Sequence, residues 1–165
     1  MNETLASSDI RDEDTLHGRY LTFQVGKETF GIPISYVIEI VGLQTITELP
    51  EMPDYIKGVI NLRGNVIPVM DVRIRFGLSQ RNYDDRTCII VVDLNGGRIG
   101  LIIDSVSDVL TIDDDEIIQT PEMSAREGSS YISRIGRTAD QIILLIDCGR
   151  LLGGDQVYVY SSIDA

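Results

Sequence analysis

Short apolar runs recur along the chain, and a polar turn closes each of them. β-branched and aromatic residues dominate the runs, which is typical of strands. The predicted strands are Tyr20–Val25, Gly31-Ile32, Val59–Leu62, Val66–Met70, Ile89–Leu94, Gly100–Ile103, Ile132–Ile135 and Ile142–Ile146. Turns that contain Gly or Asn follow the first and the fifth of these strands, at residues 26–28 and 95–97. Many short strands with frequent glycine turns predict small barrels rather than one parallel sheet.

One segment carries the signals of a helix. After Pro33 the apolar residues recur at helical spacing and end at a glycine. These residues are Ile34, Val37, Ile38, Val41 and Gly42. Their β-branched side chains disfavour a helix, although the spacing predicts one. Tyr36 and Ile40 would lie one turn apart on a second face, which either the other half of the molecule or a partner helix must cover.

The chain contains one unit written twice. With a shift of 69 positions, residues 20–41 align without a gap with residues 89–110. With a shift of 76, residues 55–77 align with residues 131–153. The matched pairs include Gly31/Gly100, Val37/Val106, Glu39/Asp108, Tyr55/Tyr131 and Asp71/Asp147. Such a repeat predicts two related half-domains.

The repeat also sets the expected domain boundaries. We expect a first half over residues 18–86 and a second half over residues 87–153, with exchange of strands between them left open. An acidic N-terminal tail, residues 1–17, is expected to be disordered because it has few apolar anchors. Residues 154–165 form a C-terminal tail with alternating Val and Tyr, either a short strand or a loosely docked segment.

Composition narrows the classes of function. The net charge of -12 argues against a nucleic-acid partner, because phosphate binding needs clustered Lys and Arg. The acidic start has no apolar core of the kind a secretory signal requires, so we expect a cytoplasmic protein. The two cysteines, Cys88 and Cys148, lie far apart in apolar runs and are expected to be reduced, buried side chains rather than a disulfide or a zinc site.

Candidates for catalysis are few. His17 is the single histidine, and no neighbouring residue organises it as a general base. The glycines of residues 95–100 join two strands, which does not suit a phosphate loop. The acidic run 113–116 is the best metal candidate, but it lacks the spacing of a calcium loop and fits the first turn of a helix capped by Thr111. We therefore expect no enzyme, no metal and no cofactor, and keep a metal-dependent small-molecule enzyme as the rival hypothesis.

A basic residue stands at the turn between two predicted strands. Gly64-Asn65 is a hairpin-type turn, with Arg63 expected at its shoulder. The second half has Thr138-Ala139-Asp140 there, so the arginine is peculiar to the first half. If Arg63 paired with Glu39, it would be held rigidly and would present its planar donors to a partner carboxylate.

Several stretches resemble the CheW-like family of chemotaxis coupling proteins. They are residues 30–34 with residues 37–40, residues 56–64, Val66-Ile67-Pro68-Val69 with Asp71, and Gly100 followed by residues 106–110. The resemblance covers about residues 19–153. It implies a mostly β fold of two SH3-like, five-stranded β-barrels related by a pseudo-twofold axis, with short helices. It further implies an adaptor that couples chemoreceptors to the histidine kinase CheA; the alternative is a module of a related pathway, either CheV-like or a chemosensory system without motility.

The resemblance also implies two binding surfaces. Receptor hairpin tips would bind in a groove between the barrels, at Val37, Glu39, Arg63, Gly100, Val106 and Val109. Gly58 and Gly64 would support the shape of this groove. The regulatory domain of the kinase, or other copies of the adaptor, would bind at Met123, Pro121 and Ile118, the last of which replaces a residue that is often basic in the family. The protein would be recruited from the cytoplasm to membrane-associated receptor arrays.

Overall fold

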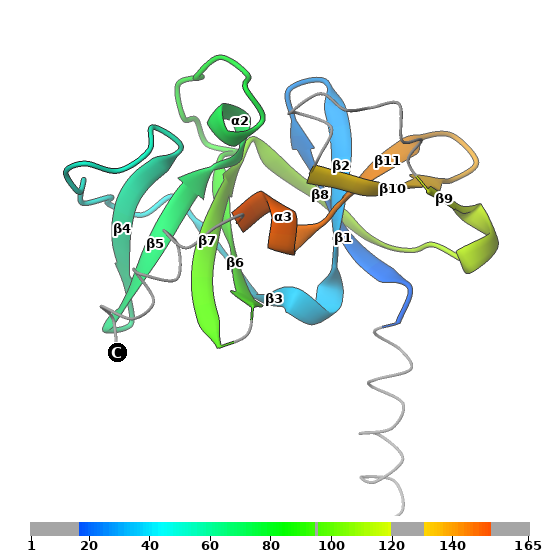
Figure 1. The fold of residues 1–165 in the computed structure, drawn as a ribbon, viewed down its shortest axis with the longest axis horizontal. Coiled ribbons are helices and arrows are strands. Elements are labelled where there is room, and N and C mark those ends of the chain that lie inside the picture. Colours follow the sequence, from blue (N-terminus) through cyan, green and yellow to red (C-terminus); the bar gives the residue numbers. More distant parts are fainter. Residues whose placement is uncertain (1–16, 95, 120–130, 153–165) are drawn as a thin grey trace, which may run out of the picture.

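The computed structural model describes residues 17–94, 96–119 and 131–152, which form two antiparallel-rich sheets side by side (Figure 1). The first sheet has six strands in the order β8-β1-β2-β11-β10-β9. These strands are β8 (Ser105–Thr111), β1 (Arg19–Val25), β2 (Glu28–Pro33), β11 (Ile142–Ile146), β10 (Ile132–Arg137) and β9 (Ile117–Gln119). The only parallel pair in this sheet, within the described residues, joins β2 to β11.

The second sheet has five strands in the order β3-β6-β7-β5-β4. They are β3 (Val37–Gly42), β6 (Cys88–Leu94), β7 (Gly97–Ile103), β5 (Asn65–Asp71) and β4 (Ile56–Leu62). Here the parallel pair joins β5 to β7. The two sheets and the few short helices confirm the mostly β fold predicted from the sequence. The six-stranded sheet exceeds the expected five strands because the three-residue β9 pairs with the edge of β10.

The internal repeat is visible in the order of the strands. Five strands of each sheet correspond in order and in direction. The corresponding pairs are β8 and β3, β1 and β6, β2 and β7, β11 and β5, and β10 and β4. Each sheet therefore contains strands from both halves of the sequence. The first two strands of each half pair with the third and the last strand of the other half. Exchange of strands is thus the rule of this fold.

The helix predicted after Pro33 is wrong. Residues Ile34–Tyr36 form only one 3₁₀ turn, η1, and Val37–Gly42 continue as strand β3. The antiparallel ladder with β6 places Ile40 opposite Ile90 and Val41 opposite Ile89, and it supplies hydrogen bonds that the spacing of apolar residues could not reveal. The β-branched side chains of this segment suit the pleated strand.

The acidic run also differs from the prediction. Asp114–Glu116 form a single 3₁₀ turn, η2, preceded by Asp113, and no side chain caps it. Thr111 is the last residue of β8 and does not act as a cap. The true short helices are α2 (Val72–Arg75) and α3 (Cys148–Leu152), which begin after the repeated residues Asp71 and Asp147. The carboxylate of Asp71 accepts a hydrogen bond from Ile74 N, and that of Asp147 accepts one from Arg150 N.

A shared core holds the two sheets together. Phe23 and Ile32 of the six-stranded sheet belong to the same buried cluster as Ile90 and Leu101 of the five-stranded sheet. Since these side chains are at most 1% exposed, the sheets are packed as one unit. Both cysteines are free thiols; Cys148 is buried in this cluster, whereas Cys88 is only half-buried, contrary to the expectation.

Polar contacts across the junction fix the relative position of the sheets. The guanidinium of Arg75 stacks on Tyr55 and on Tyr131, 4.2 Å and 5.0 Å from the ring centroids, and its Nε donates to the carbonyl of Leu151. The carboxylate of Asp104, which links β7 to β8, accepts hydrogen bonds from Arg73 and from the backbone of Gly26. Both centres join segments that are far apart in the sequence.

Candidate interaction surface

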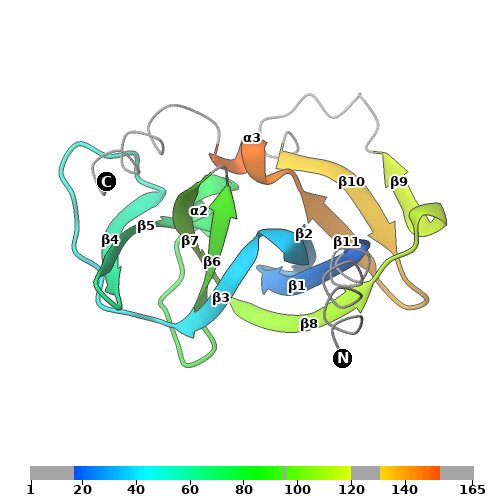
Figure 2. The ribbon, with the colours of Figure 1, turned by 90° about the horizontal axis from the view of Figure 1, so that it is seen from below.

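The edge strands β3 and β8 meet at the junction between the two sheets. Among the residues that the structure describes, each pairs with one neighbouring strand, β6 and β1 respectively. Figure 2 shows both strands on the same side of the molecule. A hollow of about 480 Å³ lies between them, lined by Ile40, Arg86, Cys88, Ser105 and Val106. We call this region, comprising β3, β8 and the hollow, the seam.

Apolar side chains gather on the seam. Along β3, Ile38 and Ile40 are exposed while Val37, Glu39 and Val41 are half-buried, because successive residues of a strand point to opposite faces. On β8, Val109 is exposed. Nine large apolar side chains are exposed among the described residues, and five of them lie on β3 or β8 or directly beside β3. The five are Tyr36, Ile38, Ile40, Leu43 and Val109. An apolar surface of this kind is typical of a protein contact.

An ion pair connects the seam to the adjacent β4–β5 turn. Arg63 Nη1 lies 2.6 Å from Glu39 Oε2, and the side chains are 68% and 26% exposed. The hydrogen bond from Arg63 lowers the pKa of Glu39 below its usual value of 4.5. The pairing of these two residues, which the sequence analysis raised only as a condition, is therefore present. Arg63 presents the rest of its guanidinium to solvent.

The position of Arg63 within the turn was predicted wrongly. The two-residue turn is Arg63-Gly64, since β4 ends at Leu62 and β5 begins at Asn65. Both turn residues have positive φ, 53° and 87°, as a tight hairpin between twisted strands requires. Asn61 Oδ1 accepts a hydrogen bond from Gly64 N, which fixes the turn. Arg63 thus lies at the tip of the hairpin and not at its shoulder.

Two glycines act through packing. Gly58 on β4 has a φ of 143°, and a Cβ atom there would clash with the carbonyl of Thr47. Gly100 is buried in β7, where a Cβ atom would lie 2.7 Å from Ile89 Cγ2 and 2.9 Å from Val69 Cγ1. Any influence of Gly100 on the seam must therefore pass through the sheet. Gly64 has open space around its Cβ position.

The residues assigned to the two surfaces by resemblance separate in the structure. Val37, Glu39, Val106 and Val109 lie on the seam, and Arg63 reaches it through Glu39. Ile118 lies on β9, at the outer edge of the six-stranded sheet, and is 48% exposed. Pro121 and Met123, like the two predicted tails apart from His17, lie outside the described residues. The sequence placed Ile38 on a helix and Cys88 in the core, and neither on a binding surface, while Arg86 was not singled out. The exposure of Ile38 would have followed from reading residues 37–42 as a strand.

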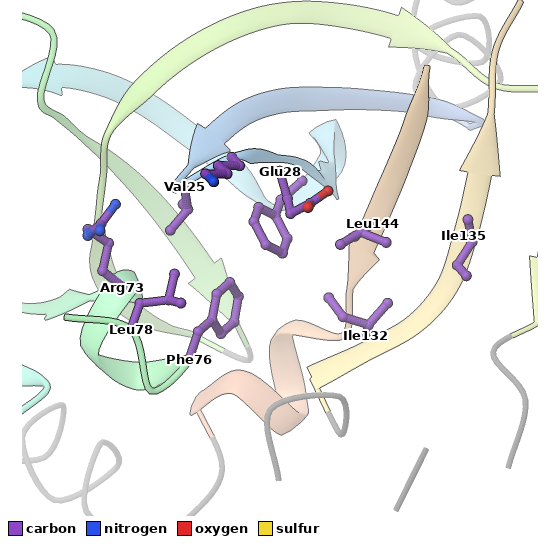
Figure 3. Close-up of a pocket in the computed structure, with 11 residues that line it drawn as sticks. Val25, Glu28, Arg73, Phe76, Leu78, Ile132, Ile135 and Leu144 are labelled. Carbon is purple, nitrogen blue, oxygen red and sulfur yellow. The ribbon is translucent and has the colours of Figure 1, made fainter. Parts of the chain in front are cut away.

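A second hollow, of about 660 Å³, opens on the six-stranded sheet (Figure 3). Val25, Phe76 and Leu78 line one side, and Ile132 and Leu144 line the other. Ile135, which also lines it, pairs with Ile118 across the β9–β10 ladder. This apolar hollow therefore lies on the same sheet as Ile118, which stands on β9 at the edge farthest from the seam strand β8.

Reactive groups are sparse in the described part of the chain. It contains no cluster of three or more His, Cys, Asp or Glu residues that would suit a metal ion. Burial raises the pKa of the Cys148 thiol to about 12 and also raises that of Cys88. Both thiols are therefore protonated at neutral pH, which makes them poor nucleophiles. Within these residues no helix has the length and apolarity to cross a bilayer.

Comparison with known proteins identifies the family. Residues 19–156 match the CheW-like domain. The chain is 32% identical to the chemotaxis protein CheW of Klebsiella aerogenes over 150 residues, which is 91% of this chain and 90% of that protein. It is 31% identical to the chemotaxis protein CheW of Helicobacter pylori, with 91% of each chain covered.

A solved structure agrees with these relatives. The crystal structure of the scaffolding protein TtCheW from Thermoanaerobacter tengcongensis superposes with a TM-score of 0.77 at 34% identity, covering 84% of this chain and 94% of that one. The resemblance found in the sequence is thereby confirmed, together with the chemotaxis adaptor class that it implied. This chain belongs to the CheW-like domain family.

Proposed function

We propose that this protein is a chemotaxis scaffold that couples chemoreceptors to the histidine kinase CheA and performs no catalysis itself. The observation that carries the proposal is the seam. Two equivalent edge strands expose apolar side chains around a hollow, in a chain that matches the CheW-like domain over most of its length. A surface of this kind binds another protein more readily than it transforms a small molecule.

The receptor would bind at the seam. Apolar side chains of the receptor tip would be buried against Ile40, Val106 and Val109, which removes apolar surface from water. The guanidinium of Arg63, oriented by Glu39, would donate to a polar or acidic group of the receptor at one side. Gly58 and Gly64 would support this arrangement by allowing β4 and its turn to take their shapes.

The regulatory domain of the kinase, or a second adaptor, would bind at the six-stranded sheet. Ile118 supplies an exposed apolar side chain at the edge of this sheet, and we propose that Pro121 and Met123 contribute to the same contact. The seam and β9 lie at opposite edges of the six-stranded sheet, so one molecule can hold both partners together at a receptor array. A signal would reach the kinase as a shift between packed arrangements that the receptor binds with different affinity.

The experiment is reconstitution with receptor-containing membranes and purified kinase. We expect the protein to sediment with these membranes and to raise kinase autophosphorylation only when receptor is present. Val109→Glu should abolish sedimentation with kinase-free receptor membranes, because it places a charge on the apolar seam. Val66→Glu, a matched change of an exposed valine on β5, should sediment like the wild type. Unchanged kinase activity on addition of the wild-type protein would contradict the proposal.

A further inference from the structure

Arg86 contributes an unpaired positive charge to the seam. It precedes β6, is exposed, and lines the hollow between β3 and β8. Its backbone N–H donates to the carboxylate of Asp84 at 2.8 Å. Its guanidinium forms no ion pair with any residue in the described ranges. Seven of the twelve Lys and Arg side chains in the described residues form no ion pair, and Arg86 is the one among them that lines the hollow.

The neighbouring carboxylate does not neutralise Arg86, because it is used elsewhere. Asp84 Oδ2 lies 3.0 Å from Arg81 Nη2. Asp84 Oδ1 accepts from the backbone of Arg86 and Thr87, and these contacts lower the pKa of this carboxyl group. The loop is therefore held by Asp84 in a conformation that leaves the Arg86 side chain available. Arg63, by contrast, already pairs with Glu39.

The internal repeat matches Arg86 to His17, and the cation on the other side, Arg19, stands two residues further along the chain. A shift of 69 matches Cys88 of β6 to Arg19 of β1, and the ladder partners of these two residues, Gly42 and Thr111, are also matched. The same shift matches Ile40 to Val109. Arg19 forms no ion pair within the described part of the chain either. Arg19 does not line the hollow, so Arg86 is the cation that stands beside its apolar side chains.

We propose that the seam binds a partner segment that carries a carboxylate beside its apolar side chains, and that Arg86 pairs with this carboxylate. The inference rests on the proposed function and specifies the chemistry of the receptor segment that the seam accepts. Arginine suits this role since its planar donors match both oxygens of a carboxylate. The apolar surface of Ile40 and Val106 beside Arg86 would exclude water once the partner is bound, which strengthens the pair.

Sedimentation with kinase-free membranes that contain a chemoreceptor tests the role of Arg86. We expect Arg86→Glu to bind about tenfold more weakly than the wild type at low salt, with the difference shrinking as salt screens the charges. Arg86→Lys should bind within about threefold of the wild type, because it keeps the charge and loses only the planar geometry. Thermal unfolding should be the same for all three proteins, since the Arg86 side chain is exposed.

Lys27→Glu is the matched control for net charge. Lys27 is exposed in the β1–β2 turn, lines the other hollow and lies away from the seam. We expect this variant to bind receptor membranes like the wild type. Equal binding of Arg86→Glu and the wild type would overturn the role of Arg86 alone, as would an equal loss in Lys27→Glu. If the wild type did not sediment with receptor membranes, the proposed function would be overturned, and the assigned partner of Arg86 with it.

Discussion

Arg63 Nη1 and Glu39 Oε2, 2.6 Å apart, join the tip of the β4–β5 hairpin to the edge strand β3. The contact spans 24 positions in the sequence and has no equivalent in the second half, where Ala139 stands in the place of Arg63. The two residues can serve the seam in two ways. The pair can hold β3 in place, or Arg63 can itself contact the partner.

Charge reversal at this pair separates the two roles. We expect Arg63→Glu to weaken coupling of receptor to kinase about tenfold, because it replaces the donor by an acceptor and sets two carboxylates side by side. The thermal midpoint should stay within a few degrees of the wild type, since an exposed ion pair contributes little to stability. Coupling is measured by kinase autophosphorylation with reconstituted receptor.

The double variant Glu39→Arg with Arg63→Glu decides the question. It restores an ion pair between β3 and the turn but exchanges the positions of the charges. If Arg63 contacts the partner, coupling stays weak in the double variant. Recovery of full coupling would show that the pair only holds β3, and full coupling in the single variant would remove Arg63 from the site.

The titration of Glu39 reports on the same contact without a partner. The hydrogen bond from Arg63 favours the charged carboxylate, so the pKa of Glu39 lies below its usual value of 4.5. We expect Arg63→Ala to raise this pKa toward 4.5, because the donor and its charge are removed. Carbon-detected NMR of the Glu39 carboxyl group over pH 2 to 6 measures it. A pKa that does not change between wild type and variant would mean that the ion pair is not formed in solution.

Gly58 should be far less tolerant of substitution than Gly64. Gly58 has a φ of 143°, and a Cβ atom there would clash with the Thr47 carbonyl. Gly58→Ala should therefore lower the free energy of unfolding by about 3 kcal/mol or prevent folding. Gly64 has a positive φ but open space, so Gly64→Ala should cost only about 1 kcal/mol. Urea denaturation of both variants measures the difference. Equal losses would contradict the close approach of Thr47 to β4.

Tyr83 should stabilise the fold through a buried carboxylate. Its hydroxyl donates to Asp71 Oδ2 at 2.8 Å, and Asp71 is only 1% exposed. Tyr83→Phe leaves that oxygen with one partner fewer, and we expect it to lower the free energy of unfolding by about 1 to 3 kcal/mol at neutral pH. Urea denaturation at pH 7 measures this loss. A variant as stable as the wild type would mean that Asp71 has another donor in solution.

The same residue predicts a dependence on alkaline pH. Burial, together with the hydrogen bond to Asp71, raises the pKa of Tyr83 well above its usual value of 10. A raised pKa means that the protonated form is favoured in the folded state, so its contribution is complete below pH 10 and is lost as the pH rises further. Between pH 9 and pH 11 the wild type should lose more stability than Tyr83→Phe. Parallel losses would exclude a contribution from Tyr83.

The sequence predicted the strands well because their signal is local. Ile142–Ile146 is β11 as predicted, and the shift of 69 carries Arg19–Val25 onto Cys88–Leu94 without a change of length. Residues 37–42 were misassigned because the spacing of Val37, Ile38 and Val41 fits one helix face as well as a strand. Only the ladder with β6, a pairing across some 50 positions, decides between them.

The candidate site was less accessible to sequence reasoning. The pairing of Arg63 with Glu39 could be raised from the sequence only as a condition, because the two residues are 24 positions apart. Gly100 was placed in the groove by resemblance, whereas it lies inside the sheet between Ile89 and Val69. Arg86 was overlooked because an exposed arginine after two aspartates reads as an ordinary loop. Its significance depends on which carboxylates are already engaged, and this is a property of the folded molecule.

The exchange of strands between two halves of different sequence makes the two sides of the seam unequal. Two separate copies of a single half could close the same pair of sheets as a swapped homodimer, but twofold symmetry would make both edge strands identical. A ligand would then fit such a dimer equally well in either of two opposite orientations. In the fused chain, Ile38 on β3 corresponds to Ser107 on β8, so the two edge strands present different side chains to a partner. Only the β4–β5 hairpin carries an arginine at its tip. Fusion of the two halves into one chain has therefore allowed the two edge strands of the seam to differ. Such a seam accepts its ligand in a single orientation and can respond differently when one end of the ligand moves or the other.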